Sequence, residues 1–327
     1  MAFARVIVAA YRQRGRNPAA ALLQAQIGPD QLCVPDARIT SRQMELLSGI
    51  AMQELDDEGL GAFARRLPWG SYGMLARASL GAPHLELAIR RWCRHHRLIA
   101  DDITLRLSSQ QGSAAISVEE HRARPAEARE FNLVHVLRNI HGLACWYIDS
   151  RIPLLEASFP FAPPPHREAY AHMFPGPHRF GAGRAEIRFD ARYLALPLRR
   201  DDEALRQMLQ HALPLTVRQY HRDRLLVQQV RQALLAQGGS PHTARSLAGL
   251  LHVSVRTLHR QLREEGASLQ QIKDEVRFER ARSLLLHGSR PIKQVAAAAG
   301  FGNEKSFIRA FRRWAGTTPA QFRSPAA

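Results

Sequence analysis

"GFGNEKSFIRAFRRWAGTTP", residues 300–319, combines helix-boundary residues with four aromatic and four basic side chains. Asn303 is a residue type that caps a helix N-terminus, and Gly316 is one that ends a helix in the left-handed conformation. Between them, the aromatic residues that recur at the spacing of one helix face are Phe307, Phe311 and Trp314. The stretch therefore predicts an amphipathic helix with a basic outer face. Because basic helices are common as solvated surfaces, the preceding sequence has to decide its role.

A second copy of this pattern lies upstream, in "SVRTLHRQLREEG" (254–266). Ser254 can cap its N-terminus, Gly266 can end it, and Leu258 and Leu262 share one face at i, i+4. Each of these helices follows a shorter apolar helix across a tight turn; the two shorter segments are "TARSLAGLL" (243–251) and "PIKQVAAAAG" (291–300). A short helix, a tight turn and a second helix with a basic face form the helix-turn-helix arrangement.

The segment between the two units, "LQQIKDEVRFERARSLLLHG" (269–288), predicts one helix from Leu269 to His287. At about 1.5 Å per residue, its nineteen or so residues span roughly 28 Å. One turn of B-DNA is about 34 Å long, so this spacer could hold two helices in successive major grooves. Within it, we expect structural roles for Arg277, Arg280 and Arg282, with Arg280 pairing with Glu279 or Asp274.

The charge of the chain is concentrated in its last third. The 327 residues include 46 Lys and Arg against 29 Asp and Glu, a net charge of +17. Residues 221–327 hold 18 of these basic residues and 7 of the acidic ones, against 28 and 22 in residues 1–220. Such an excess favours a polyanionic partner, either nucleic acid or an anionic membrane. A base-composition bias of the genome explains the preference for Arg over Lys, but it does not explain the excess over acids.

Cysteine usage and hydropathy bear on the compartment. Cys33, Cys93 and Cys145 are far apart and form no Cys-x-x-Cys pair. This pattern argues against a disulfide framework or a zinc finger and fits a reducing cytoplasm. No segment approaches the ~18 apolar residues of a membrane span. We therefore expect a cytoplasmic protein, partly associated with the nucleoid, without a membrane partner.

The first part of the chain predicts a mixed α/β domain with a mainly antiparallel sheet. Helices are predicted over residues 17–28, 40–55, 84–99, 127–148 and 201–213. Strands are predicted over residues 102–107, 113–119, 152–161 and 184–190. The first two strands form a hairpin, and a further helix over 222–237 ends at Gly238-Gly239. We place the domain boundary near residue 220, which gives an α/β domain over 1–220 and an all-α domain over 221–327.

Residues 222–323 resemble the DNA-binding domain of the AraC/XylS family of bacterial transcription regulators. The likeness rests on "RFERARSLL" in the spacer and on the run from Gly300 to Arg323 that includes the opening stretch. One departure is the run of alanines 296–299, where the family usually has a bulkier residue. These small side chains either allow close packing or leave the second unit less stable.

The N-terminal domain resembles the subgroup of ornithine-utilisation-type regulators. Its quoted segments are "GRNPAAALL" (15–23), "FPFAPPPHREAYAHMF" (159–174), "RFGAGRAEIRFD" (179–190) and "LALPLRRDD" (194–202). This resemblance implies a domain of arabinose-binding type that senses a small molecule and dimerises.

The DNA-contacting residues follow from the helix-turn-helix geometry, in which the second helix meets base edges. The resemblance implies base contacts by Arg256, His259 and Arg260 in the first unit. In the second unit, the exposed face offers Glu304, Lys305, Ile308 and Arg309, of which Ile308 suits a thymine methyl group. Arginine suits guanine and a carboxylate suits the amino group of cytosine. Phosphate contacts are expected from Arg263, Arg312 and Arg313. The alternative for each residue is a solvated helix face.

An effector pocket is implied by the resemblance, and "PWGSYGML" (68–75) offers candidate lining residues. Trp69 and Tyr72 lie among glycines there, and His96 lies on the next helix. The alternative is that these residues belong to the core or to turns. An amino acid or small carboxylate is the expected effector class.

The sequence contains no motif for metal binding, dinucleotide binding or nucleophilic catalysis. The histidines lack metal-ligand spacing, "FGAGRAE" (180–186) lacks the third glycine of a dinucleotide loop, and no nucleophile motif occurs. We expect no metal, no cofactor and no enzyme activity. The predicted function is a ligand-responsive transcription activator that binds double-stranded DNA as a homodimer and recruits RNA polymerase. The alternative is a ligand-independent regulator whose N-terminal domain only dimerises.

Overall fold

The computed structural model describes residues 1–34, 37–210, 224–236, 243–286, 288 and 290–323. The chain divides into two compact units, Met1–Asp223 and Arg224–Ala327. The domain boundary that the sequence predicts near residue 220 lies outside the described residues, as do the last three residues of the helix predicted over 201–213. The same holds for the helix end predicted at Gly238-Gly239.

The N-terminal unit is built on one five-stranded sheet. Its strands are β1 (Ile103–Gln110), β2 (Ser113–Glu120), β3 (Leu154–Phe159), β4 (His178–Phe180) and β5 (Ala185–Asp190), in the order β1-β2-β5-β3-β4. All neighbours are antiparallel except β3 and β4. The hairpin of β1 and β2 turns at Gln111 and Gly112, whose φ angles of 49° and 79° suit a tight two-residue turn. The predicted mainly antiparallel sheet is confirmed, whereas β4 was not predicted.

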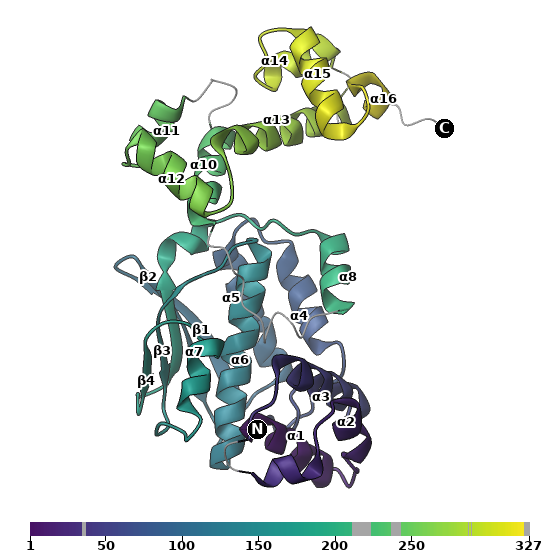
Figure 1. The fold of residues 1–327 in the computed structure, drawn as a ribbon, viewed down its shortest axis with the longest axis vertical. Helices are drawn as coiled ribbons and strands as arrows, with labels where there is room; N and C mark the ends of the chain where they lie inside the picture. The colour runs from purple at the N-terminus through teal and green to yellow at the C-terminus, as the bar shows by residue number, and fades with distance from the viewer. Residues whose placement is uncertain (35–36, 211–223, 237–242, 287, 289, 324–327) are drawn as a thin grey trace. The chain divides into compact units, whose positions relative to one another are not determined.

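Helices cover one side of this sheet (Figure 1). They are α1 (Ala2–Gln13), α2 (Ala19–Gln24), α3 (Ser41–Glu54), α4 (Ser71–Leu80), α5 (Leu85–Ile99), α6 (Ala126–Tyr147), α7 (Tyr170–Met173) and α8 (Asp202–Gln210), with 3₁₀ turns at Pro29–Cys33, Arg167–Ala169 and Ala191–Ala195. The central helix α6 contacts β2, β5, α1 and α5, and it is buried on most sides from Phe131 to Tyr147. Helices α4 and α8 pack against each other, and α4 also packs on α5. The predicted helix over 17–28 is shorter than expected, and α1 was not predicted.

The C-terminal unit is helical throughout its described part. Its elements are α10 (Leu225–Ala236), α11 (Ala244–Leu250), α12 (Val255–Glu264), α13 (Leu269–Leu286), α14 (Ile292–Ala298), α15 (Glu304–Ala315) and α16 (Pro319–Arg323). Side-chain oxygens cap α11, α12 and α15, where Thr243 accepts from the N–H of Ser246, Ser254 from that of Thr257 and Asn303 from that of Ser306. Ser268 and Thr318 cap α13 and α16 in the same way. The predicted caps are therefore present, and Gly316 ends α15 with a φ of 73°.

Helix α13 contributes to two separate apolar cores. The N-terminal half of α13, with Leu269, Ile272 and Val276, packs with α10, α11 and α12. Its C-terminal half, with Ala281 and Leu285, packs with α14 and α15. Figure 1 shows α11 and α12 near one end of α13 and α14 to α16 near the other. At about 1.5 Å per residue, the 18 residues of α13 span roughly 27 Å, as the sequence predicts. No helix in the described part of the chain is long and apolar enough to cross a membrane.

Candidate functional site

Helix α12 presents a basic face on the side away from its core. Leu258 and Leu262 are both 0% exposed and fix the orientation of the helix. The exposed residues opposite them follow at i, i+3, i+4 and i+7: Arg256, His259, Arg260 and Arg263. Arg260 has an ion pair to Glu264 at 3.4 Å, but both side chains are more than half exposed, so the contact is weak. Neither Arg256 nor Arg263 has an ion-pair partner among the described residues.

Helix α15 presents a comparable face with a different charge pattern. Lys305, Arg309 and Arg312 are exposed and have no ion-pair partner in the described part of the chain. Glu304 lies in the first turn of α15 and is half-buried. Its negative charge there interacts favourably with the positive end of the helix dipole. Arg313 differs from Arg312 because it forms an ion pair with Asp274 of α13, at 3.2 Å.

Ion pairs connect α13 to the helices on either side of it. The Arg231 side chain of α10, only 6% exposed, pairs with Glu275 and with Glu279. The acids that the sequence assigns to Arg280 therefore pair elsewhere: Glu279 with Arg231 and Asp274 with Arg313. The guanidinium of Arg277 also lies 5.2 Å from the centre of the Phe301 ring. These contacts hold the two helix-turn-helix units on one spacer.

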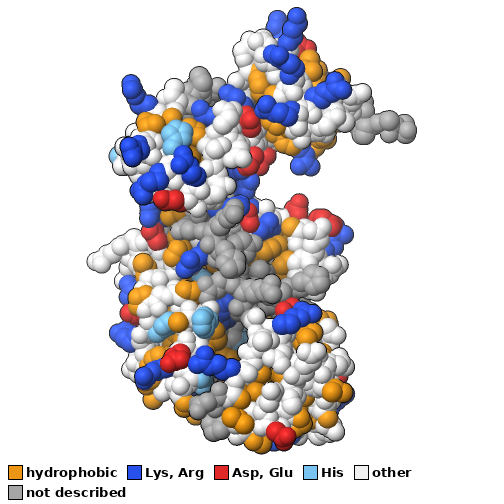
Figure 2. Space-filling view, in the orientation of Figure 1, with side chains coloured by type: hydrophobic (Ala, Val, Ile, Leu, Met, Phe, Trp, Pro, Cys, Tyr) orange, Lys and Arg blue, Asp and Glu red, His pale blue; other side chains and the backbone are white. Residues whose placement is uncertain are grey.

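The surface of the C-terminal unit is predominantly basic around both helix-turn-helix units. Figure 2 shows Lys and Arg side chains over the region of α11 and α12 and around α14 to α16. Exposed Lys and Arg side chains that have no acidic partner are available to contact phosphate oxygens. Each of the two helices therefore offers a face that suits a polyanion.

The N-terminal unit contains a cavity of about 290 Å³, and the three predicted effector residues all lie in its wall. Trp69 precedes α4, Tyr72 lies on α4 and His96 on α5. The Tyr72 ring meets Trp92 edge-on, with 5.3 Å between ring centres, and His96 meets Phe63 in the same way at 5.8 Å. Aromatic and aliphatic side chains therefore form most of the wall, as is typical of small-molecule sites.

Polar groups in the wall of the cavity come from α5 and α6. His135 and Asn139 are one turn apart on α6, and their side chains are 2.9 Å apart. Burial lowers the pKa of His96 to about 4, and burial together with the nearby His96 lowers that of His135 to about 4. Both imidazoles are therefore uncharged at neutral pH.

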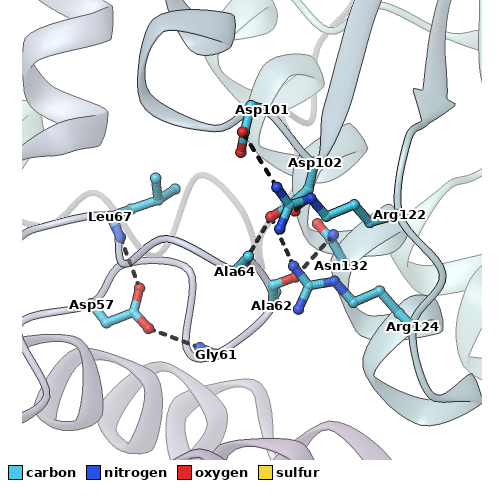
Figure 3. Close-up of polar contacts among 10 residues, drawn as sticks. All are labelled: Asp57, Gly61, Ala62, Ala64, Leu67, Asp101, Asp102, Arg122, Arg124 and Asn132. Carbon is cyan, nitrogen blue, oxygen red and sulfur yellow. Dashed lines mark hydrogen bonds and ion pairs between the residues drawn. The ribbon is translucent and has the colours of Figure 1, made fainter.

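The loop before α4 forms one wall of the cavity, and two buried aspartates hold it in place (Figure 3). Asp57, 1% exposed, accepts hydrogen bonds from the backbone N–H groups of Gly59, Gly61 and Leu67, at 3.0, 2.9 and 3.1 Å. It also forms an ion pair with Arg14, the residue that follows α1. The loop residues Phe63 and Leu67 then face the cavity.

Asp102, at the start of β1, holds the same loop from the other side. Its carboxylate accepts from the backbone N–H of Ala64 at 2.6 Å and pairs with Arg124 at 2.7 Å and Arg122 at 3.3 Å. The amide of Asn132 on α6 donates to the carbonyl of Ala62 at 3.2 Å. The loop is thus fixed to the sheet and to α6 as well as to α1.

Sequence reasoning missed most of the cavity wall. The missed residues include Glu58, Phe63, Trp92, His135 and Asn139. One signal was available, since His135 and Asn139 lie at i, i+4 on the same face of α6. The described residues contain no group of three His, Cys, Asp or Glu side chains placed to hold a metal ion.

Comparison with known proteins extends these observations. The family described as "Arabinose-binding domain of AraC transcription regulator, N-term" matches residues 15–198, and a "Helix-turn-helix domain" matches residues 247–324. The chain is 26% identical to the ornithine utilization regulator of Pseudomonas aeruginosa, over 99% of this chain and 95% of that protein. It is 35% identical to the HTH-type transcriptional activator RhaS of Citrobacter koseri, over 24% of this chain and 28% of that protein.

Among solved structures, the transcriptional regulator CdpR of Pseudomonas aeruginosa is 19% identical, with 94% of this chain and 96% of that chain covered and a TM-score of 0.36. The first family match covers more than half of the chain, and the relatives are transcription regulators rather than enzymes. The prediction of a mixed α/β domain followed by a helical DNA-binding domain is confirmed. The chain belongs to the AraC family of DNA-binding transcription regulators and carries an arabinose-binding-type N-terminal domain.

Proposed function

We propose that this protein is a ligand-responsive transcription activator that inserts α12 and α15 into successive major grooves on one face of its operator. The observation that carries the proposal is the pair of basic helix faces held on the spacer α13, whose length of roughly 27 Å is close to one turn of B-DNA. The description of RhaS as an activator supports the direction of regulation. The active form is a homodimer that recruits RNA polymerase.

The exposed residues of the two helices divide into two roles. Arg256, His259 and Arg260 contact bases from α12, and Glu304, Lys305 and Arg309 contact bases from α15. Arg263 and Arg312 contact phosphates, since they lie toward the C-terminal ends of these helices, away from base edges. Arg313 can contact phosphate only by sharing its guanidinium with Asp274, so its contribution is smaller.

Selection of bound sequences from a random duplex pool, with the full-length protein, tests this division. Arg260→Ala and Arg309→Ala each weaken binding to the selected site by about 1–3 kcal/mol and relax preference at one base pair. Arg312→Ala weakens binding to all DNA sequences alike, and it reduces the slope of log affinity against log salt concentration by about one. Arg282→Ala is the matched control, because it removes an exposed arginine from α13 instead. Unchanged sequence preference in both of the first two variants would sink the proposed reading role.

The cavity supports the ligand-responsive part of the proposal. It lies between α4, α5 and α6, so a ligand there contacts the helices that cover the sheet. The expected consequence is a change in operator affinity or dimer geometry when the cavity fills. The test is a thermal-shift screen of small organic molecules followed by operator binding with each stabilising compound. A protein that only dimerises through this domain would show neither stabilisation nor a change in operator binding.

A further inference from the structure

The charges around the cavity restrict what it can bind. Its described lining residues include no Lys or Arg, and Glu58 is the one acidic side chain among them. Both carboxylate oxygens of Glu58 are already engaged: they accept from the backbone N–H groups of Gly70 and Tyr72, at 2.7 and 2.6 Å. Glu58 thus helps to start α4, and although burial raises the pKa of its carboxyl, this side chain offers an anion no positive charge.

The histidines do not supply the missing positive charge. His96 is only 6% exposed and packs edge-on against Phe63, and its pKa is lowered to about 4 by burial. His135 stacks on Phe131 at 5.5 Å and binds the Asn139 amide, and its pKa is likewise lowered to about 4. A carboxylate in the cavity would therefore have no cationic partner among the described lining residues, which is unfavourable.

Neutral hydrogen-bonding groups, in contrast, are available. Three buried polar atoms of lining residues have no hydrogen-bond partner among the described residues: Tyr72 Oη, His96 Nδ1 and Asn139 Oδ1. Because one atom of the Asn139 amide binds His135, either orientation of that amide leaves the other atom unpartnered. Buried polar atoms are normally hydrogen-bonded. Each of these three has almost no accessible surface, so a ligand supplies its partner only where the neighbouring side chains shift as the ligand enters.

The remaining wall is apolar and the volume is small. About 290 Å³ is near the lower end of the ~300–1,000 Å³ typical of ligand pockets. The rings of Phe63, Trp69 and Trp92 and the aliphatic side chain of Val136 suit a compact ring-containing body.

Resting on the ligand response proposed above, we propose that the effector is an uncharged, mostly apolar, ring-containing molecule with hydrogen-bonding groups that reach Tyr72, His96 and Asn139, and that the cavity rejects carboxylates. This proposal replaces the amino acid or small carboxylate that the sequence led us to expect. The loop held by Asp57 and Asp102 shapes the cavity before the ligand arrives, so the selection by charge is built into the fold.

A matched series of probes on one skeleton tests the charge selection. The full-length protein is titrated calorimetrically with 2-phenylethanol, phenylacetate and 2-phenylethylamine, which share a ring and a two-carbon chain but differ in charge. We expect the alcohol to bind at least about tenfold more tightly than the carboxylate, with the amine between them. Equal or tighter binding of phenylacetate overturns the proposal, while the ligand response itself survives. Binding by none of the three also overturns it, and the thermal-shift screen then decides the proposed function separately.

A conservative variant tests the hydrogen-bonding role. Tyr72→Phe keeps the ring against Trp92 and removes only the hydroxyl. The wild type should prefer 2-phenylethanol to ethylbenzene, and the variant should lose about fivefold of that preference. Met74→Ala, at a 53% exposed position on the same helix, is the control and should leave the preference unchanged. An unaltered preference in Tyr72→Phe removes Tyr72 from the ligand contacts and counts against the proposal.

Discussion

In the first helix-turn-helix unit the exposed reading helix packs through leucines, whereas in the second it packs through phenylalanines. Leu258 and Leu262 of α12 and Phe307 and Phe311 of α15 are all 0% exposed and all lie at i, i+4. The two helices therefore share a spacing of buried positions, and they do not share the residues that fill them. The comparison shows that the orientation of a reading helix depends on which face is apolar, and that different side chains can supply that face.

The partners of these side chains differ less. In the second unit, α14 supplies Val295 and Ala296, and Ala299 follows it at the C-cap, all buried against the rings of α15. In the first unit, α11 supplies Leu247 and Ala248 against the leucines of α12. Small residues facing large ones preserve packing density. Of the two interpretations left open for the alanine run, the packing therefore favours close approach of the helices over a weakened unit.

The largest expected effect comes from truncating a buried side chain in each of the two cores. Leu262→Ala removes a buried leucine from the first core and should destabilise it by about 2–5 kcal/mol, and Phe311→Ala should destabilise the second by about 3–5 kcal/mol. Because the cores share only α13, each change should reduce hydrogen-exchange protection mainly in its own core. The measurement is native-state amide exchange, read for α10 to α12 and for α14 to α16 separately.

The control for both variants is Leu250→Ala, at a 54% exposed position on α11. It should change exchange protection little, because the side chain is already in contact with water. If either core variant instead lowers protection equally in both units, the two cores unfold together, and the comparison between them fails as a description of stability.

Local patterns made most of this C-terminal unit predictable. Ser254, Asn303 and Gly316 are boundary residues whose action involves only the next few residues, so sequence alone places them. The buried face of each helix followed from periodicity for the same reason. The partners of Glu279 and Asp274 did not, because Arg231 and Arg313 approach from helices 48 and 39 residues away. An ion pair between helices depends on how they pack, which no local pattern records.

The cavity illustrates the same limit more strongly. Trp69 and Tyr72 could be proposed because aromatic residues among glycines stand out within one short stretch. His135 and Asn139 come from α6, and they reach the cavity only because α6 packs against α5. The role of Asp57 in holding the loop 57–67 was equally hidden, since it stands in the acidic run 56–58 and such residues usually lie on the surface.

A smaller effect is expected from the ion pairs that tie each unit to α13. Arg231→Ala should destabilise the contact of α10 with α13 by about 2 kcal/mol, because the side chain is buried although its two glutamate partners are half exposed. Arg313→Ala should cost less than about 1 kcal/mol, since Arg313 is 69% exposed. Urea denaturation of both variants gives the loss in overall stability. Amide hydrogen exchange in α10 and α15 then shows which helix each substitution affects. Arg231→Met, which keeps the aliphatic stem, separates lost packing from lost charge.

The smallest effect concerns the caps, and here the two units should behave alike. Ser254 accepts from the N–H of Thr257 at 3.0 Å, and Asn303 accepts from that of Ser306 at 2.8 Å. Ser254→Ala and Asn303→Ala should each destabilise their helix by about 1 kcal/mol. The substitutions Ser254→Asn and Asn303→Ser should be nearly neutral, because serine and asparagine both cap helices well. The measurement is exchange protection in the first turns of α12 and α15. If Ser254→Asn or Asn303→Ser destabilises its helix as much as the alanine substitution does, the capping residue makes a further contact that is specific to its own unit. The two units would then differ at the N-termini of their reading helices as well as in their cores.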